Sequence, residues 1–170
     1  MGASKRIRTD GDLLILKKTL EASNQRAREV LRALVDEQGF MQRLKFEPLG
    51  CDPLDLSDAQ NFAEQIDQQA TYSTGVVALA YLFRVHPDKE WDFAPGAHGS
   101  GHDIASTDGS VAAEVFAAVK PDNNNKLNKD ILKVAAFAGP HRYVFFSSPA
   151  RAASEWDDAG VRIVSLGIVA

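Results

Sequence analysis

The sequence predicts an α/β fold with a mixed central sheet, and three patterns support this. Apolar residues recur every three or four positions over residues 12–38, as they do on one face of an amphipathic helix. Two strand-like runs flank Asp108 and Gly109, and an Asp-Gly pair in that setting is a strong hairpin signal. A helical pattern over residues 125–137 leads to a continuous apolar run at 143–146, typical of a strand buried on both faces. That step predicts a right-handed crossover between parallel strands.

The N-terminal half is predicted to be mainly helical. Gly39 is a good C-terminal stop for the first helix. Ser57 and Gln60 fit a capping box, which predicts that a second helix begins there. Residues 73–86 predict a further helix, with a strand as the open alternative, and Pro87 ends it. We therefore expect helices in this half to pack on the sheet.

The C-terminal half supplies the strands of the predicted sheet. Residues 90–94, 102–106 and 110–120 are expected to form a three-stranded meander. Residues 148–159 predict a short helix, and residues 161–169 predict the last strand. The core order is therefore αβββαβ, preceded by N-terminal helices.

Composition fits one domain over residues 1–170, with a mainly helical part at 1–87 and a sheet-forming core at 88–170. The formal net charge of −4 argues against a general polyanion binder. We see neither the apolar run of about 18–20 residues that a membrane span needs nor an apolar signal sequence near the start. A cytoplasmic protein without membrane contact is expected. The single Cys51 excludes an intrachain disulfide.

Asp103 and Glu114 form the pair in which chemistry is to be sought. The Asp-Gly turn sets a register that places Asp103 directly opposite Glu114. Cross-strand partners have Cβ atoms about 4.5–5.5 Å apart, and like charges there are destabilising. Two such acids share a proton or hold a cation, and carboxylate oxygens suit Mg²⁺. The alternative is a longer turn, or an Asp103 side chain that points to solvent.

This pair and its surroundings resemble the PD-(D/E)XK nuclease-like, or restriction-endonuclease-like, superfamily. The matching stretches are Gly-His-Asp-Ile at residues 101–104, the Asp-Gly turn, and Ala-Glu-Val-Phe at residues 113–116. The predicted order of elements over about residues 64–146 also looks like the αβββαβ core of that family.

The resemblance implies a metal site and a reaction. Asp103 and Glu114 would bind Mg²⁺, with Mn²⁺ as a substitute, and Val115 would lend a backbone carbonyl. The metal would activate water for attack on a phosphodiester. Members of the family often add an acid from a preceding helix, and Glu64 is the candidate here, beside a predicted inner stripe of Phe62 and Ile66. The alternative for Glu64 is an ordinary surface position.

The chain departs from the family pattern at Phe116, which stands where the family has a lysine. Lys120 shares a strand face with Glu114 but lies about 20 Å away along the strand. The next helix must run back along the strand, and its rise would bring Lys133 to the level of Glu114. Lys126 is the candidate if the helix crosses steeply. The alternative for both is a solvated lysine stripe.

Other signals in this region are weaker. His98 and His102 have a spacing that suits a zinc site on a helix, but the glycine-rich stretch around them does not predict a helix. His102 alternates with Asp103 along the strand, so we expect it to face the other way and pack. Ser100 stands between Gly99 and Gly101, but a nucleophile elbow needs glycines two positions on either side, where His98 and His102 stand.

The sequence therefore leads to a Mg²⁺-dependent nuclease that hydrolyses phosphodiester bonds, with DNA as the expected substrate. One rival is a catalytically inactive nuclease-like module that binds nucleic acid or a partner protein. A second rival is a structural or regulatory protein in which the two acids share a proton. The sequence leaves the oligomeric state open, and a homodimer is among the alternatives.

Overall fold

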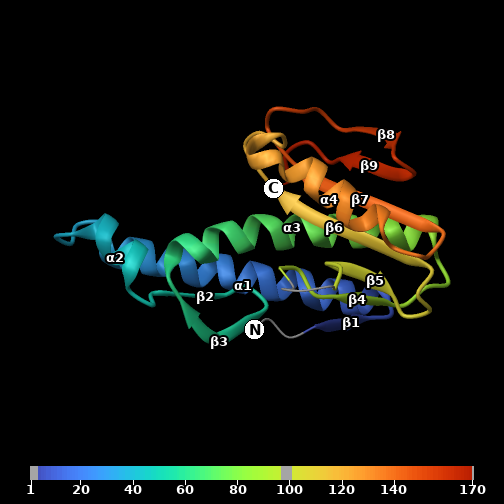
Figure 1. Cartoon of the computed structure of the whole chain (residues 1–170). Helices are drawn as coiled ribbons and strands as arrows, with labels where there is room; N and C mark the ends of the chain where they lie inside the picture. The colour runs from blue at the N-terminus through green and yellow to red at the C-terminus, as the bar shows by residue number, and fades with distance from the viewer. Residues whose placement is uncertain (1–3, 97–100, 170) are drawn as a thin grey trace.

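A computed structural model describes residues 4–96 and 101–169 of the chain. It is an α/β protein with a seven-stranded mixed sheet and a separate two-stranded hairpin (Figure 1). The helices are α1 (Asp10–Leu34), α2 (Phe40–Phe46), α3 (Phe62–Val85) and α4 (Lys126–Ala135), with a short 3-10 turn, η1 (Asn123–Asn125), before α4. The strands are β1 (Lys5–Ile7), β2 (Gly50–Asp52), β3 (Asp55–Gln60), β4 (Trp91–Phe93), β5 (Ile104–Ser106), β6 (Val111–Ala117), β7 (His141–Ser147), β8 (Ser154–Asp158) and β9 (Val161–Ser165).

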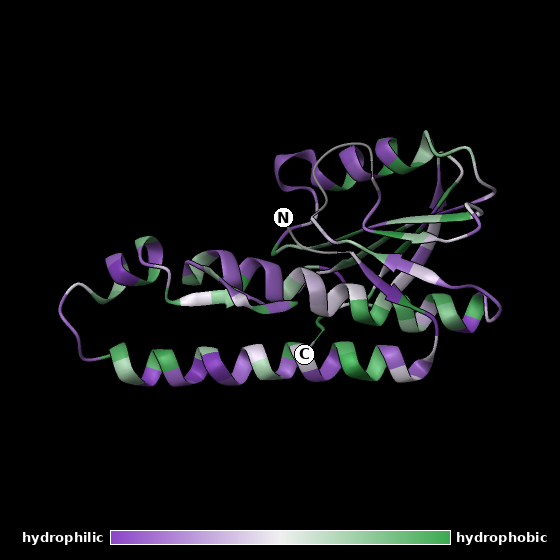
Figure 2. Ribbon diagram, turned by 90° about the horizontal axis from the view of Figure 1, so that it is seen from below, coloured by the Kyte–Doolittle hydropathy of each residue, from purple (hydrophilic) through white to green (hydrophobic). Residues whose placement is uncertain are grey.

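The large sheet has the strand order β1-β4-β5-β6-β7-β9-β8. Strands β4, β5 and β6 form an antiparallel meander, and β7 then lies parallel to β6 because α4 carries the chain back. The long helices α1 and α3 run side by side along one face of the sheet, and α4 covers the opposite face, as Figure 2 shows edge-on to these layers. Figure 2 shows the same arrangement from below, with α2 and the β2–β3 hairpin extending beyond the sheet.

Each face of the sheet has its own apolar core. On the α3 side, Leu13, Leu16 and Leu20 of α1 belong to one buried cluster with Phe93 and Phe145. The N-terminal helices and the later strands therefore share a core. Helix α3 approaches the sheet closely at Gly75, where a Cβ atom would lie 2.5 Å from the ring of Phe93. A smaller cluster on the other face joins α4 to β6, β7 and β9.

The predicted hairpin is confirmed in its register. Ile104 pairs with Ala113, and Ala105 pairs with Ala112, as the Asp-Gly turn required. Gly109 has φ of 70°, a conformation that glycine adopts without strain. The predicted helix over residues 125–137 and the buried strand at 143–146 are also confirmed, as α4 and β7.

The predicted start of the second helix is wrong. Ser57 and Gln60 lie in strand β3, and the helix begins after Asn61, whose side chain accepts a hydrogen bond from the Glu64 N–H. Gln60 pairs with Gly50 in the β2–β3 hairpin, so residues 57–60 are extended, and Asn61, a good N-cap residue, begins the helix after them. The helix then continues without a break to Val85. Its inner face differs from the predicted stripe, because Ile66 is 57% exposed.

The predicted helix over residues 148–159 is also wrong. The segment contains strand β8, which pairs antiparallel with β9 in a tight hairpin. Ala159 and Gly160 both have positive φ, 49° and 73°, which a two-residue turn between twisted strands favours. Ala159 and Gly160 form this turn, and an Ala-Gly pair predicts a hairpin less strongly than an Asp-Gly pair does.

Three short elements lie where the sequence predicted none. Strand β1 comes from the basic start of the chain and pairs with β4, with Arg6 opposite Asp92. Strand β2 occupies the predicted loop after residue 50, and α2 follows the first helix. Within the parts of the chain that the structure describes, none of the helices is long and apolar enough to cross a membrane.

Candidate functional site

Glu114 lies in the middle of β6 on the face that α4 covers. Glu114 is only 2% exposed, although it carries an ionisable carboxyl group. One carboxylate oxygen, Oε1, lies 2.7 Å from Nδ1 of His102, and the other, Oε2, accepts a hydrogen bond of 2.8 Å from the Lys133 ammonium. A buried acid normally needs partners of this kind, and Glu114 has one on each oxygen.

Asp103 is the residue that precedes β5, and the register of the hairpin places it opposite Glu114. It is 6% exposed. Its Oδ2 accepts the Val115 N–H at 2.8 Å, and its Oδ1 accepts the Gly96 N–H at 3.0 Å. The carboxylate thus accepts the Val115 N–H beyond the last β5–β6 pair, Ile104 with Ala113, while Val115 pairs with Phe145 of β7 on its other side.

The negative charge of Asp103 acts on the Glu114 carboxyl group. Burial raises the pKa of Glu114 above its usual value, and the negative charge of Asp103 raises it further. Hydrogen bonds from Lys133 and His102 oppose this rise. Burial raises the pKa of Tyr72 in α3 to about 12, and the charges of Asp52 and then Asp103 add to that rise. Because Glu114 faces α4 and Tyr72 lies in the cluster on the α3 side, the charge of Asp103 acts on groups on both faces of the sheet.

The structure brings Lys133 to Glu114 but holds Lys126 elsewhere. Helix α4 runs back along β6, so the Lys133 ammonium reaches Glu114 from the last turn of the helix. The Lys126 ammonium instead lies 2.7 Å from Oδ1 of Asp130 and 5.5 Å from the centre of the Phe116 ring. The two candidate lysines thus contact different residues along the packed face between α4 and β6.

His102 does not face away from the pair, as the alternation predicted. Its ring contacts Glu114 and meets the ring of Phe137 edge to face, with 5.4 Å between centroids. Alternation fails because β5 begins only at Ile104, so His102 lies outside the regular strand. The His102 prediction was therefore wrong, and the residue joins the site.

Asp130 is a second member that the sequence reasoning missed. It lies on the inner face of α4, is 4% exposed and binds Lys126. Burial raises its pKa, and the hydrogen bond and charge of Lys126 oppose that rise. The charge of Asp103 adds a smaller rise, and Lys133 lowers the pKa slightly. The available signal was an acid between Leu127, Ile131 and Val134, the apolar stripe that packs α4 on the sheet.

Glu64 is not brought to the pair. It is exposed in the first turn of α3, and its backbone N–H is capped by Asn61. Among residues 4–96 and 101–169, no group of three or more His, Cys, Asp or Glu side chains is spaced to hold a metal ion. His98 and Ser100, considered from the sequence, lie outside the residues that the structure describes.

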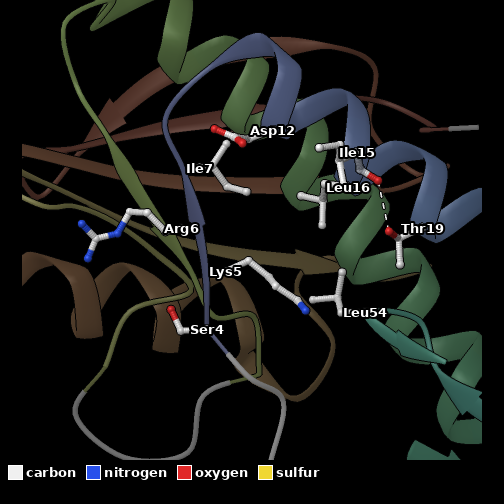
Figure 3. A pocket seen from close by; sticks show the side chains of 9 residues that line it. All are labelled: Ser4, Lys5, Arg6, Ile7, Asp12, Ile15, Leu16, Thr19 and Leu54. Atoms are coloured by element: carbon white, nitrogen blue, oxygen red, sulfur yellow. Dashed lines mark hydrogen bonds between the residues drawn. The ribbon is translucent and has the colours of Figure 1, made fainter. Parts of the chain in front are cut away.

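A cavity of about 250 Å³ lies elsewhere, between β1, α1 and Leu54 (Figure 3). Its walls are mainly apolar, with Ile7, Ile15 and Leu16 beside the Lys5 side chain. None of the candidate residues lines it, so the candidate site is the polar cluster between β6 and α4.

This cluster consists of Asp103, Glu114, Lys133, His102 and the Asp130–Lys126 pair. Comparison with known protein families, with curated proteins and with solved structures gives no match.

Proposed function

We propose that this protein is a Mg²⁺-dependent phosphodiesterase of the restriction-endonuclease-like kind, and that its substrate is DNA. The order α3, β4, β5, β6, α4, β7 supports this, because the strands β4 to β7 are also neighbours in that order in the sheet. The observation that carries the proposal is Glu114, a buried carboxylate across a hairpin from a second buried carboxylate, with a helix lysine at 2.8 Å.

The residues present fit a magnesium ion held by two carboxylates. Mg²⁺ in nucleotide-processing sites is bound by one or two carboxylates and keeps water and substrate phosphate as its other ligands. Burial and, after it, the charge of Asp103 raise the pKa of Glu114, and a cation bound beside the two carboxylates would oppose that rise. Asp103 and Glu114 would hold the ion, and a bound Mg²⁺ supplies a more acidic water and neutralises phosphate charge.

The chain's own residues have distinct tasks in this proposal. His102 and Lys133 fix the orientation of the Glu114 carboxylate by contacting one oxygen each. The Val115 and Gly96 N–H groups fix Asp103 in the same way. A lysine of α4, Lys133 or Lys126, would stabilise the negative charge that builds on the phosphate in the transition state, in place of a strand lysine at Phe116.

One observation favours the alternative, a catalytically inactive nuclease-like module that binds nucleic acid or a partner protein. All four carboxylate oxygens of Asp103 and Glu114 already have a partner within 3.0 Å. A site whose acids are satisfied internally can persist for structural reasons without binding a metal.

The test is metal binding measured together with cleavage. Mg²⁺ or Mn²⁺ should raise the melting temperature, because a ligand at about 100 times its Kd stabilises the folded state by about 2.7 kcal/mol. Duplex and single-stranded DNA should be cleaved in the presence of either ion. Glu114→Gln should abolish both effects, whereas Glu64→Gln, an exposed acid of α3, should retain both.

Two results would count against the enzyme. Wild-type protein that is indifferent to millimolar Mn²⁺ would remove the metal site. Metal-induced stabilisation without cleavage of any DNA or RNA would favour the inactive module.

A further inference from the structure

The two lysines of α4 are held in different ways. Lys133 is committed to Glu114, a buried acid that would otherwise lack a full counter-ion, and its side chain is 33% exposed. Lys126 is bound by Asp130, and its side chain is 47% exposed. Lys126 therefore exposes more of its side chain to a molecule that approaches from solvent, although Asp130 holds its ammonium in place.

The Lys126 ammonium lies over the ring of Phe116. Residue 116 is two positions after Glu114 on the same strand, so both side chains project from the same face, about 7 Å apart along β6. The Lys126 ammonium is 5.5 Å from the centre of the Phe116 ring, a distance at which a cation is attracted to the ring face. A positive charge thus lies above a strand position whose own side chain carries none.

Asp130 is a buried acid on the apolar face of α4. It sits among Leu127, Ile131 and Val134 on the face that packs against the sheet, where an apolar side chain would bury more easily. Its Oδ1 holds Lys126, but its buried Oδ2 has no hydrogen-bond partner within the described structure. An unsatisfied buried acceptor is unfavourable, so packing alone does not account for this one.

We propose that Asp130 is a positioning residue that holds the Lys126 ammonium over Phe116 so that it receives a phosphate of a bound nucleic-acid strand. The inference rests on the proposed function, since it requires that nucleic acid enters this site. It separates the two lysines: Lys133 is the counter-ion of Glu114, and Lys126 contacts the substrate. Asp130 restricts Lys126 to one position, which a flexible surface lysine does not have.

The experiment measures binding of a fluorescent DNA duplex by the full chain in EDTA, so that cleavage does not interfere. Lys126→Ala should weaken binding about tenfold near 0.1 M salt and lower the slope of log K against log salt by about one, as loss of one phosphate contact does. Lys129→Ala is the matched control, because Lys129 is an exposed lysine of the same helix and has the same charge. It should change binding by less than about twofold.

A double-mutant cycle tests the role of Asp130. In an Asp130→Asn background, Lys126→Ala should cost markedly less affinity than in the wild type, because the released lysine contacts the phosphate less often. With metal present, Asp130→Asn should lower kcat and leave the metal-induced rise in melting temperature intact. Lys126→Arg should restore part of the binding that Lys126→Ala loses.

The outcomes distinguish the roles of Lys126 and Asp130 from the proposed nuclease function. Equal losses for Lys126→Ala and Lys129→Ala, or additive effects of Lys126→Ala and Asp130→Asn, would overturn this inference while wild-type cleavage and metal binding keep the proposed function. Wild-type protein that binds neither DNA nor Mn²⁺ would overturn both.

Discussion

The two faces of strand β6 differ sharply, although the same seven residues form them. Toward α3, the strand presents Val111, Ala113 and Val115, which are buried in an apolar cluster. Toward α4, the middle position is Glu114, buried to the same extent. Successive strand residues point to opposite faces, so the change from core to polar cluster occurs within one residue.

The difference shows which face is built for stability alone. Apolar burial on the α3 side stabilises the fold with no polar group to satisfy. On the α4 side, burial raises the pKa of Glu114 and of Asp130, so the ionised acids are held at a cost that only their partners offset. A protein that needed only a packed helix on this face would do better with leucine at both positions.

The largest effect on stability should come from placing a charge on the apolar face of β6, compared with placing an apolar side chain on its polar face. Val115→Asp places an unpaired charge in the apolar cluster, and we expect it to remove at least about 4 kcal/mol and largely unfold the protein. Glu114→Leu should fold and melt at or above the wild-type temperature without metal, while losing the gain from Mn²⁺. Urea denaturation and thermal melts measure both. Similar destabilisation by the two substitutions would show that the α4 face is ordinary core.

Removing the counter-ion should give a smaller effect. Lys133→Met keeps the apolar stem of the side chain but leaves Glu114 with His102 alone. We expect a loss of about 1–3 kcal/mol in the free energy of unfolding at neutral pH, because a buried acid loses a charged partner. The same substitution in a Glu114→Gln background should have little effect. If both backgrounds respond alike, Lys133 stabilises the fold by packing and not by charge.

The smallest effect concerns a titrating group at the margin of the α3 face. His86 ends α3, and its Nε2 lies 2.9 Å from the Tyr143 hydroxyl. Burial lowers its pKa below the usual 6.5, neighbouring His141 and Lys89 lower it further, and Asp108 opposes them. The folded protein therefore binds this proton less readily than the unfolded chain does, so stability should fall as pH drops below 6.5.

His86→Gln should flatten that decline while leaving stability above pH 7 nearly unchanged. Denaturant melts at several pH values between 5 and 8 give the measurement, with Glu114→Gln as a comparison on the other face. An unaltered acid-side slope in His86→Gln would assign the decline to other groups.

Much of the site's frame was predictable because it depends on local turn and helix geometry. The Asp-Gly turn gave the register that sets Asp103 opposite Glu114, and the rise per residue of a helix gave the level of Lys133. His102 was missed because alternation holds only inside a strand, and the strand starts two residues later. Asp130 could have been found from its place on the apolar stripe of α4, three residues after Leu127 and four before Val134, but only the lysines of this helix were considered.

The elements that escaped prediction depend on partners far along the chain. Strand β1 has three residues, and it forms only because β4 offers an edge more than eighty positions later. Strand β8 alternates weakly and is set by an Ala-Gly turn. The start of α3 depended on choosing Asn61 over Ser57 as the cap, a competition that local rules rank poorly.

The composition of the two outermost strands also bears on how the protein behaves at high concentration. Strand β1 offers only Lys5–Ile7 as an open edge, and β8 carries Glu155, Asp157 and Asp158 in five residues. Open strand edges template the growth of a sheet by further chains unless they are short or charged. Joining two copies symmetrically at β8 would set these acids against one another. Both ends of the sheet are thus guarded against runaway β-aggregation.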